Sequence, residues 1–440
     1  MRAIVLVLFV LQLAPAAIVY PQTTTEGDLP RRADLGVVLR PPTATAPATV
    51  ARVGDGSALQ RAGLRANDII VSFNGRPIAD AIDLDRRVAA LRGGQQVTVE
   101  IARDGTRQTI AAQLAPLPLE QLAGTEIRYT HIANPRGLRQ RAILSRPAGA
   151  AGRLPAILFV PWLSCDSIES PGRASPGIDE LLQKLAMDSG WALLRVDKPG
   201  VGDSDGVCAD TDLETEIDGS RAALTWLRAH PWIDPTRIVV MGQSFSGAFL
   251  PMVAGDAPVA GYIVLNSWVR TWMERLLEFE RLQAESSGMA PADVSTRQRK
   301  LAEFYVLFLE QQKTPQQVMI ERPELAAVWS DAPEHQYGRS ARFHHQLQRI
   351  NPADRWSRVS APTLVMWSDA DLVMHRSDHE RLVAMVNRNR AGAATLVIVP
   401  GADHALAARD DTGQPHLPAI VSGAIRQFLQ RLHDATRSPG

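Results

Sequence analysis

The six residues GQSFSG (242–247) follow directly on the apolar run RIVVM (237–241), and this junction decides the fold. A short β-branched run of this kind predicts a buried strand, and the small residues after it predict a sharp turn into a helix. In such a turn the backbone of the central serine is strained and its hydroxyl group projects. Ser244 is therefore the candidate nucleophile. Ser246 opens a second frame, because it stands where the pattern G-x-S-x-G has its second glycine.

Similar apolar runs occur on both sides of this junction, and helical periodicity fills the segments between them. Strands that alternate with helices predict an α/β fold, in which a mostly parallel sheet carries helices on both faces. The predicted strands are 156–160, 192–196, 237–241, 260–265, 363–366 and 395–399, and the predicted helices include 217–228 and 418–432.

The strands stop between residues 268 and about 350, where only helical periodicity remains. A long insertion between two strands predicts a helical cap over one edge of the sheet. The segment is rich in aromatic side chains, from which we expect the cap to face an apolar acyl or leaving group. These residues are Trp268, Trp272, Phe279, Phe304, Phe308 and Trp329.

A serine hydroxyl is a poor nucleophile unless a base removes its proton and a third group fixes the tautomer of that base. Among the histidines, His404 lies on the loop after the last predicted strand and is the candidate base. The acid is expected just after the preceding strand, where Asp371 is the first candidate and Asp369 the second.

His375 and His379 are four residues apart and could in principle grip a metal ion from one helix face. No third ligand stands in a recognisable pattern, so we interpret the pair as part of a solvated helix face. The sequence therefore predicts neither a metal nor an organic cofactor.

Residues 125–435 resemble the α/β-hydrolase superfamily, because the serine turn, the acid and the histidine come in that family's order. The stretch DKPGVGDSDG (197–206) is also very like the family's D-x-x-G-x-G-x-S turn. The resemblance implies a catalytic triad of Ser244, Asp371 and His404. It further implies an oxyanion hole, in which the N–H of Phe245 is one donor to the substrate oxygen.

The second oxyanion donor comes in that family from the loop after the strand 156–160, where this chain departs from the pattern. The loop reads PWLSC (161–165) in place of an opening His-Gly. Pro161 has no N–H to give, so Trp162 is the candidate donor.

Cys165 and Cys208 are the two cysteines of the chain. In the fold that the resemblance implies, each follows one of two neighbouring strands, on the rim that carries the catalytic loops. An oxidising compartment would permit them to pair. We predict a disulfide rather than two free thiols, worth about 4 kcal/mol on the chain-entropy model.

Residues 30–116 combine period-2 alternation, glycine turns and one helical stretch. They resemble a bacterial PDZ domain through GSA (56–58), AGL (62–64), ND (67–68) and NG (74–75), although glycine is commoner than Asn67. In that family a peptide adds as a strand beside the segment that here includes Leu35, Gly36 and Val37. The resemblance implies a peptide C-terminus as partner. The alternative is that the module only packs on the catalytic domain.

The N-terminus has the marks of a cleavable secretory signal: Arg2, an apolar core from Ala3 to Leu11, and small residues up to Ala16. A retained anchor is the alternative, but it would barely reach the ~20 residues that a span needs. We expect a bacterial periplasmic or secreted protein with no integral membrane span after cleavage. The predicted organisation is a signal peptide (1–16), a linker (17–29), a PDZ domain (30–116) and a hydrolase domain (117–440) with its cap at 268–350.

The composition agrees with a folded chain of two or three domains. The 440 residues are 45% hydrophobic and 21% charged, with a mean hydropathy of −0.09, which is too apolar for disorder and too polar for a membrane bundle. Basic and acidic residues balance at 47 each, which removes the electrostatic argument for a nucleic-acid partner.

The sequence thus predicts an exported serine hydrolase that cleaves an ester or amide bond through an acyl-enzyme on Ser244. A carboxylesterase, a peptidase acting on C-termini held by the PDZ domain, and an acyltransferase all share these residues. A PDZ adaptor with an inactive hydrolase fold is the non-enzymatic alternative, because the serine turn and the oxyanion loop are altered.

Overall fold

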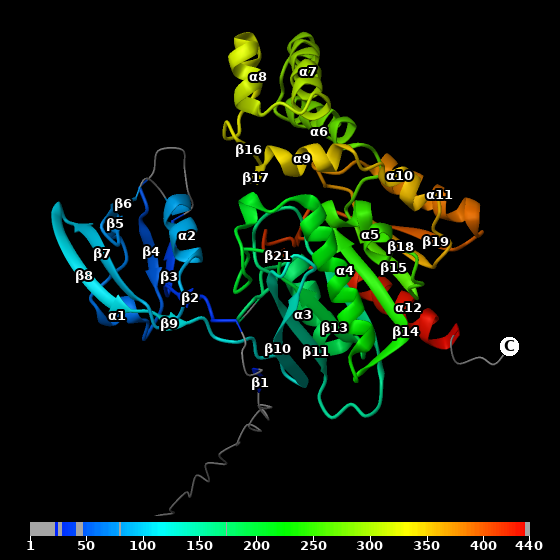
Figure 1. Ribbon diagram of the computed structural model, residues 1–440, viewed down its shortest axis with the longest axis horizontal. Helices are drawn as coiled ribbons and strands as arrows, with labels where there is room; N and C mark the ends of the chain where they lie inside the picture. The colour runs from blue at the N-terminus through cyan, green and yellow to red at the C-terminus, as the bar shows by residue number, and fades with distance from the viewer. Residues whose placement is uncertain (1–22, 25–28, 41–46, 79–80, 173, 436–440) are drawn as a thin grey trace, which may run out of the picture.

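The computed structural model describes residues 23–24, 29–40, 47–78, 81–172 and 174–435, so the predicted signal peptide at 1–16 lies outside the described residues. Figure 1 shows a small N-terminal module beside a larger body that carries the main sheet and a helical cap. None of the helices in the described ranges combines the length and the apolar character needed to cross a membrane.

The body is built on a nine-stranded sheet in the order β1-β10-β11-β13-β12-β14-β15-β18-β19. The six strands from β13 to β19 run parallel, whereas β11 is antiparallel to both of its neighbours. The predicted α/β class is therefore confirmed. The strands are β1 (Thr23–Thr24), β10 (Thr125–Ala133), β11 (Arg139–Pro147), β12 (Leu154–Val160), β13 (Ala192–Val196), β14 (Ile233–Gln243), β15 (Gly261–Leu265), β18 (Thr363–Ser368) and β19 (Ala394–Val399).

Helices cover both faces of this sheet. Alternate side chains of each central strand are therefore buried on opposite sides. In β12, Leu158 and Val160 pack in the core beneath α4 and α5, whereas Ile157 and Phe159 pack against α3 and α12. The helices of the body are α3 (Ile178–Asp188), α4 (Leu213–Ala229), α5 (Leu250–Ala254), α10 (Pro352–Trp356), α11 (Arg376–Asn389) and α12 (Ala419–Ala435), with the short turns η1 (Cys208–Asp210) and η2 (Ser244–Phe249).

The strands predicted for the body are all present, but the prediction omits β10 and β11 at one side of the sheet. These strands mix charged residues with apolar ones, so no purely apolar run marks them. Arg141 of β11 is fully buried, because its guanidinium donates to the carboxylate of Asp203 over 2.9 Å. A search for apolar runs cannot find a strand whose buried charge has a partner far away in the sequence.

The predicted cap lies between β15 and α10, and Figure 1 shows its helices rising from one end of the sheet. Its aromatic side chains form the interior of the cap: Trp268, Trp272, Phe304 and Phe308 are each at most 2% exposed. Packing within the cap accounts for their burial, so the expected apolar acyl or leaving group stays a prediction. The cap consists of α6 (Trp272–Ser286), α7 (Pro291–Tyr305), η3 (Val306–Glu310), α8 (Pro315–Glu321), η4 (Pro323–Val328), β16 (His335–Gln336), β17 (Arg339–Ser340) and α9 (Ala341–Gln348).

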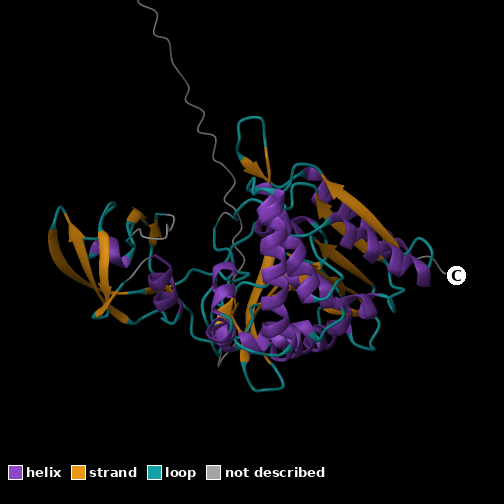
Figure 2. Cartoon of the chain, turned by 90° about the horizontal axis from the view of Figure 1, so that it is seen from above, coloured by secondary structure: helices purple, strands orange, loops and turns teal. Residues whose placement is uncertain are grey.

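The N-terminal module has its own apolar core, and Figure 2 shows it standing to one side of the body. Among the described residues, β3 pairs only with β4, so its second edge has no strand partner. The elements are β2 (Ala33–Asp34), β3 (Val37–Leu39), β4 (Val50–Val53), α1 (Ala58–Arg61), β5 (Ile69–Phe73), β6 (Arg76–Pro77), α2 (Ala81–Ala89), β7 (Gln96–Arg103), β8 (Thr106–Gln113) and β9 (Ala115–Pro116).

The chain enters and leaves this module side by side, because β2 pairs with β9. Two residues before β2, Arg31 forms ion pairs with Glu169 over 2.7 Å and with Asp203 over 2.5 Å. Both carboxylates are almost fully buried in the body. Buried ion pairs therefore fix the start of the module to the body. Arg31, which forms them, lies within the range 30–116 that was predicted for the PDZ domain.

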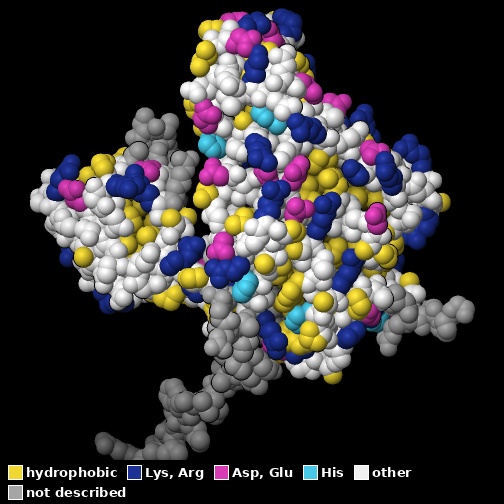
Figure 3. All heavy atoms as spheres, viewed as in Figure 1, with side chains coloured by type: hydrophobic (Ala, Val, Ile, Leu, Met, Phe, Trp, Pro, Cys, Tyr) yellow, Lys and Arg dark blue, Asp and Glu magenta, His cyan; other side chains and the backbone are white. Residues whose placement is uncertain are grey.

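On the face of the molecule shown in Figure 3, basic and acidic side chains are interspersed. This agrees with the balanced charge of the whole chain.

Candidate active site

Ser244 stands at the junction between β14 and η2, with φ at +58°. This left-handed conformation is strained for a residue with a side chain. The turn is also tight, because a Cβ on Gly242 would lie 2.7 Å from the Ser246 hydroxyl oxygen and 2.8 Å from a methyl carbon of Leu250. The local sequence therefore builds the predicted turn from one strained serine and one glycine that has no room for a side chain.

Ser246 has a structural contact that explains the departure from G-x-S-x-G. Its hydroxyl is fully buried, donates to the carbonyl oxygen of Val160 over 2.7 Å and accepts from the backbone N–H of Gln243 over 3.1 Å. It ties the turn to β12, so the geometry does not favour it as nucleophile. Gly247 supplies the close approach, since a Cβ there would lie 2.6 Å from Ser267.

His404 lies between Ser244 and Asp371. Its Nε2 is 2.8 Å from the Ser244 hydroxyl oxygen, and its Nδ1 is 2.8 Å from Asp371 Oδ2. Because the carboxylate accepts from Nδ1–H, Nε2 is left as the acceptor that faces the serine. Ser244 lies 160 positions before His404 along the chain and Asp371 lies 33 positions before it, yet the three residues form one line of hydrogen bonds suited to proton transfer.

The carboxylate of Asp371 is held by more than the histidine. Its side chain is fully buried, and Oδ1 accepts from the N–H groups of Val373 over 2.6 Å and Met374 over 3.1 Å. Charge-assisted bonds of this kind fix the orientation of a carboxylate. Asp369, the second candidate, instead accepts from the N–H of Gly401 over 2.6 Å, so it braces the loop that carries His404.

The sequence prediction did not identify two side chains that hold the histidine loop. Gln243 and Asn266 each donate to the carbonyl oxygen of His404, over 2.9 Å and 3.1 Å. Asn266 is fully buried and also accepts from the N–H of Ser368 over 2.8 Å. Only their positions in the sequence could have indicated this role: Gln243 directly precedes the serine, and Asn266 directly follows the predicted strand 260–265.

The two oxyanion candidates follow two neighbouring strands, Trp162 after β12 and Phe245 after β14. Phe245 is the second residue of η2 and is buried, and its ring packs against Phe249 and Trp268. Trp162 is half-buried after β12, and its ring lies 5.9 Å from that of Phe159. Their assignment as backbone donors remains a proposal.

Cys165 and Cys208 are joined by a disulfide, with their Cα atoms 6.0 Å apart. Cys165 closes the loop that follows β12, and Cys208 begins η1. The bridge therefore fastens the loop that carries Trp162 to the segment after β13.

His379 corrects the prediction of a solvated helix face for the pair at 375 and 379. It is 1% exposed, its Nε2 accepts from the N–H of Ser267 over 2.9 Å, and its Nδ1 contacts the carbonyl oxygen of His375 over 3.0 Å. Burial lowers the pKa of His379 to about 4. Across the described part of the chain, no group of three or more His, Cys, Asp or Glu side chains is arranged to hold a metal ion.

Two family models match the chain. The model described as X-Pro dipeptidyl-peptidase (S15 family) matches residues 137–405, and the model described as PDZ domain matches residues 33–114. The match at 137–405 contains all three residues of the hydrogen-bonded line.

Curated relatives match over short segments. Proteins named probable periplasmic serine endoprotease DegP-like are 36% identical over 73 residues in Pseudomonas fluorescens and 37% identical over 82 residues in Pseudomonas putida. These segments cover 17% and 18% of this chain, but only 15% and 17% of the relatives. The chain thus spans less than a fifth of their length.

Solved structures match over most of the chain at low identity. Est1E from Butyrivibrio proteoclasticus with bound ferulic acid is 18% identical, covers 69% of this chain and 99% of its own, and gives a TM-score of 0.44. The Pyrococcus furiosus esterase Pf2001 is 12% identical, covers 70% and 91%, and gives a TM-score of 0.44.

Proposed function

The chain belongs to the X-Pro dipeptidyl-peptidase (S15) family and carries a PDZ module, and from this premise we propose that it is an exported serine hydrolase that cleaves an ester or amide bond through an acyl-enzyme on Ser244. The observation that carries the proposal is the hydrogen-bonded line from Ser244 through His404 to Asp371. This arrangement supplies both groups that activate a serine: a base that removes its proton and a carboxylate that orients the base.

The proposed reaction begins when Nε2 of His404 takes the proton of the Ser244 hydroxyl as its oxygen attacks the substrate carbonyl carbon. The electron pair of the C=O bond moves to the oxygen, and the N–H groups of Phe245 and Trp162 are assigned to receive that charge. Asp371 stabilises the imidazolium that forms. His404 then gives its proton to the leaving alcohol or amine.

A water molecule completes the cycle. His404 removes one of its protons as the water oxygen attacks the acyl-enzyme, and returns that proton to the oxygen of Ser244 as the ester bond to the enzyme breaks. The side chain of His404 is 26% exposed, so water can reach it from outside. An alcohol or amine in place of water would make the same site an acyltransferase.

The PDZ module is proposed to receive a peptide C-terminus along β3. The unpaired edge of this strand among the described residues and the 47% exposure of Val38 support strand addition there. The N–H of Gly36 already donates to Asp34 over 2.8 Å, so Leu35 and Val37 are the members of the predicted set that remain to bind the carboxylate. A peptide C-terminus held by the module, together with the family's description, favours a peptide substrate. We therefore favour a peptidase over a carboxylesterase.

Export is proposed from three features that agree. The predicted signal peptide, the disulfide between Cys165 and Cys208, and the periplasmic description of the DegP-like relatives all fit an oxidising compartment.

A fluorophosphonate probe tests the nucleophile, with Ser246→Ala as the matched control for Ser244→Ala. We expect the wild type and Ser246→Ala to be labelled and Ser244→Ala to be unlabelled, with its turnover lower by at least about 10⁴-fold. Labelling of Ser244→Ala would reject the proposed nucleophile, and a folded wild type that is never labelled would favour the inactive adaptor. A panel of acyl esters beside X-Pro and other aminoacyl anilides then separates esterase from peptidase.

A further inference from the structure

One buried ammonium group, that of Lys198, binds the loop after β12 through three carbonyl oxygens. Lys198, two residues after β13, is 5% exposed, and its Nζ donates to the carbonyl oxygens of Trp162 over 2.8 Å, Leu163 over 2.9 Å and Ser164. An ammonium group has three protons to donate, and all three go to this loop.

A second buried cation reaches the same loop from the cap. Arg339 of β17 is fully buried and donates to the carbonyl oxygen of Leu163 over 3.2 Å and to that of Thr211 over 3.1 Å. It also forms an ion pair with Glu216 of α4. Two cations from distant parts of the chain therefore converge on the carbonyl oxygen of one residue.

These contacts decide which way the peptide groups of the loop face. In a trans peptide the N–H points away from the C=O of the preceding residue. These three carbonyl oxygens share their peptide groups with the N–H groups of residues 163–165, which therefore point away from Lys198. The N–H of Trp162 belongs instead to the peptide group of Pro161, so Lys198 holds Trp162 in place through its carbonyl oxygen. Without the ammonium group, three neighbouring carbonyl oxygens would repel one another and the peptide groups would rotate.

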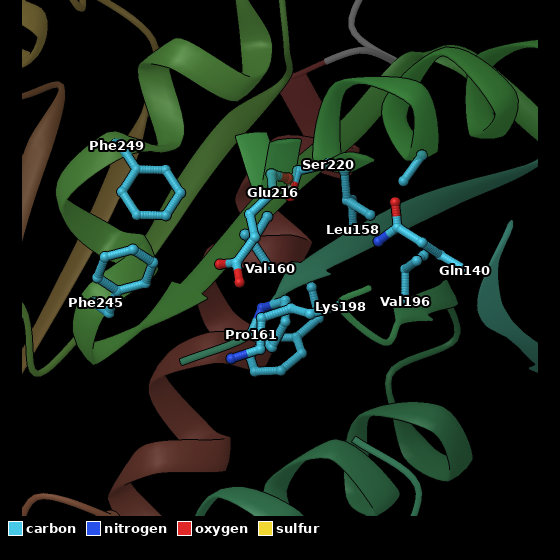
Figure 4. Close-up of a pocket in the computed structure, with 12 residues that line it drawn as sticks. Gln140, Leu158, Val160, Pro161, Val196, Lys198, Glu216, Ser220, Phe245 and Phe249 are labelled. Carbon is cyan, nitrogen blue, oxygen red and sulfur yellow. Dashed lines mark hydrogen bonds between the residues drawn. The ribbon is translucent and has the colours of Figure 1, made fainter. Parts of the chain in front are cut away.

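Figure 4 shows the side chain of Lys198 beside Pro161 and near Glu216. The side chains of Lys198, Glu216 and Phe245 line one cavity of about 20 Å³ together with Val160 and Pro161. A cavity of this size can hold a single water molecule. The ammonium group thus lies close to both segments to which the oxyanion donors are assigned.

We propose that Lys198, supported by Arg339, is a positioning residue of the hydrolase: its ammonium group fixes the backbone of residues 162–164 and so holds Trp162 where its N–H can donate to the substrate oxygen. This inference rests on the proposed function of Ser244. It adds a role to a lysine that the hydrolase motifs leave without one.

The charge of Lys198 also favours the reaction. The charged groups around it are Glu216 on α4, Arg339 on β17, Asp166 in the same loop and Asp197 at the end of its own strand. Glu216 is itself paired with Arg339. A positive charge in a water-poor environment stabilises negative charge that develops nearby.

The test compares Lys198→Met with Lys184→Met in the full-length protein, using p-nitrophenyl acetate as the substrate. Lys184 is the matched control, because its side chain is 41% exposed on α3. We expect Lys198→Met to lower kcat by about 10²-fold with KM within about twofold, as the loss of an oxyanion donor does, and the control to retain wild-type kinetics. A folded Lys198→Met with wild-type kcat would overturn the proposal.

A second variant gives an answer even where Lys198→Met does not fold. Burial lowers the pKa of Lys198 to about 8, so the ammonium group loses a proton and its charge as the pH rises through that value. We expect kcat of the wild type to fall above about pH 8 and the fall in Lys198→Arg to move above about pH 10, because arginine stays charged. A fall that stays near pH 8 in Lys198→Arg, or is absent from the wild type, contradicts the inference.

Ser244→Ala separates this inference from the proposed function. If Ser244→Ala is inactive while Lys198→Met keeps full activity, only the role of Lys198 is rejected. If Ser244→Ala keeps full activity, the nucleophile itself is wrong.

Discussion

The turn at 242–247, which carries the proposed nucleophile, and the loop at 161–165, to which the second oxyanion donor is assigned, are held in different ways. The turn is fixed by its own backbone, through the left-handed Ser244 and the close approach at Gly247. The loop has no regular structure, and its contacts come from residues far along the chain, Lys198 and Cys208 among them. A site can therefore combine one element that folds locally with another that depends on the completed tertiary structure.

Removing the disulfide should break the loop and leave the turn intact, and it has the largest expected effect on stability. Cys165→Ser with Cys208→Ser releases a closed loop of 43 residues, which costs about 4 kcal/mol on the chain-entropy model. Urea unfolding measures the loss, and we also expect lower kcat because the loop carries Trp162.

Dithiothreitol provides the control for this double variant. It should weaken the oxidised wild type to the level of the variant and leave the variant unchanged. Equal stability of the wild type and the variant would show that the bridge does not constrain the loop.

Acid should break the support of the turn instead. His379 accepts from the N–H of Ser267, the residue against which Gly247 packs, and burial lowers the pKa of His379 to about 4. The unfolded chain, with a histidine pKa near 6.5, binds more protons between these two values, so the free energy of unfolding falls as the pH drops from about 6.5 to about 4. The expected loss for this group is on the order of 3 kcal/mol.

His379→Gln isolates this contribution from other acid effects, because glutamine does not titrate but can still accept and donate. Unfolding in urea at pH 7 and at pH 4.5 measures the slope for each protein. Equal slopes for the wild type and His379→Gln would show that His379 does not cause the acid sensitivity.

The same comparison explains what the sequence could predict. Ser244, the α/β class and the placement of Asp371 and His404 after successive strands follow from local patterns, because each pattern lies within a few residues. Lys198 and Arg339 carry no local signal, since their roles depend on which segments meet in space. The aromatic residues of the cap show a related limit, because an aromatic side chain that packs inside a helical insertion cannot be distinguished by type from one that lines a binding site. The expected apolar substrate therefore stays a prediction.

A single methyl group should test how tightly the turn is packed. Gly247→Ala would place a Cβ 2.6 Å from Ser267, and such overpacking costs about 1–3 kcal/mol. Gly423→Ala is the matched control, because a Cβ there would meet no atom within 4 Å inside α12, and the change should stabilise the helix by roughly 0.5–1 kcal/mol. If both variants have the same stability in urea, the turn is not close-packed at residue 247.

The smallest effect is expected from removing the PDZ module. This removal asks whether the segment that follows the loop at 161–165, which includes Glu169, depends on the whole module or only on Arg31. Asp34 and Ala115 are paired across β2 and β9, so residues 35–114 can be replaced by two glycines without moving Arg31 from Glu169. A deletion that begins at residue 23 would remove Arg31 as well and would confuse the two roles.

We expect this excision to leave kcat for a small ester within about twofold, because the buried pair that joins the module to the body is kept. Arg31→Met in the full-length chain should lower kcat more than the excision does, since it leaves Glu169 and Asp203 without that partner in a buried site. Initial rates with p-nitrophenyl acetate measure both. If the excision costs more activity than Arg31→Met, the module supports the catalytic loop through contacts other than Arg31, and its role is not recruitment alone.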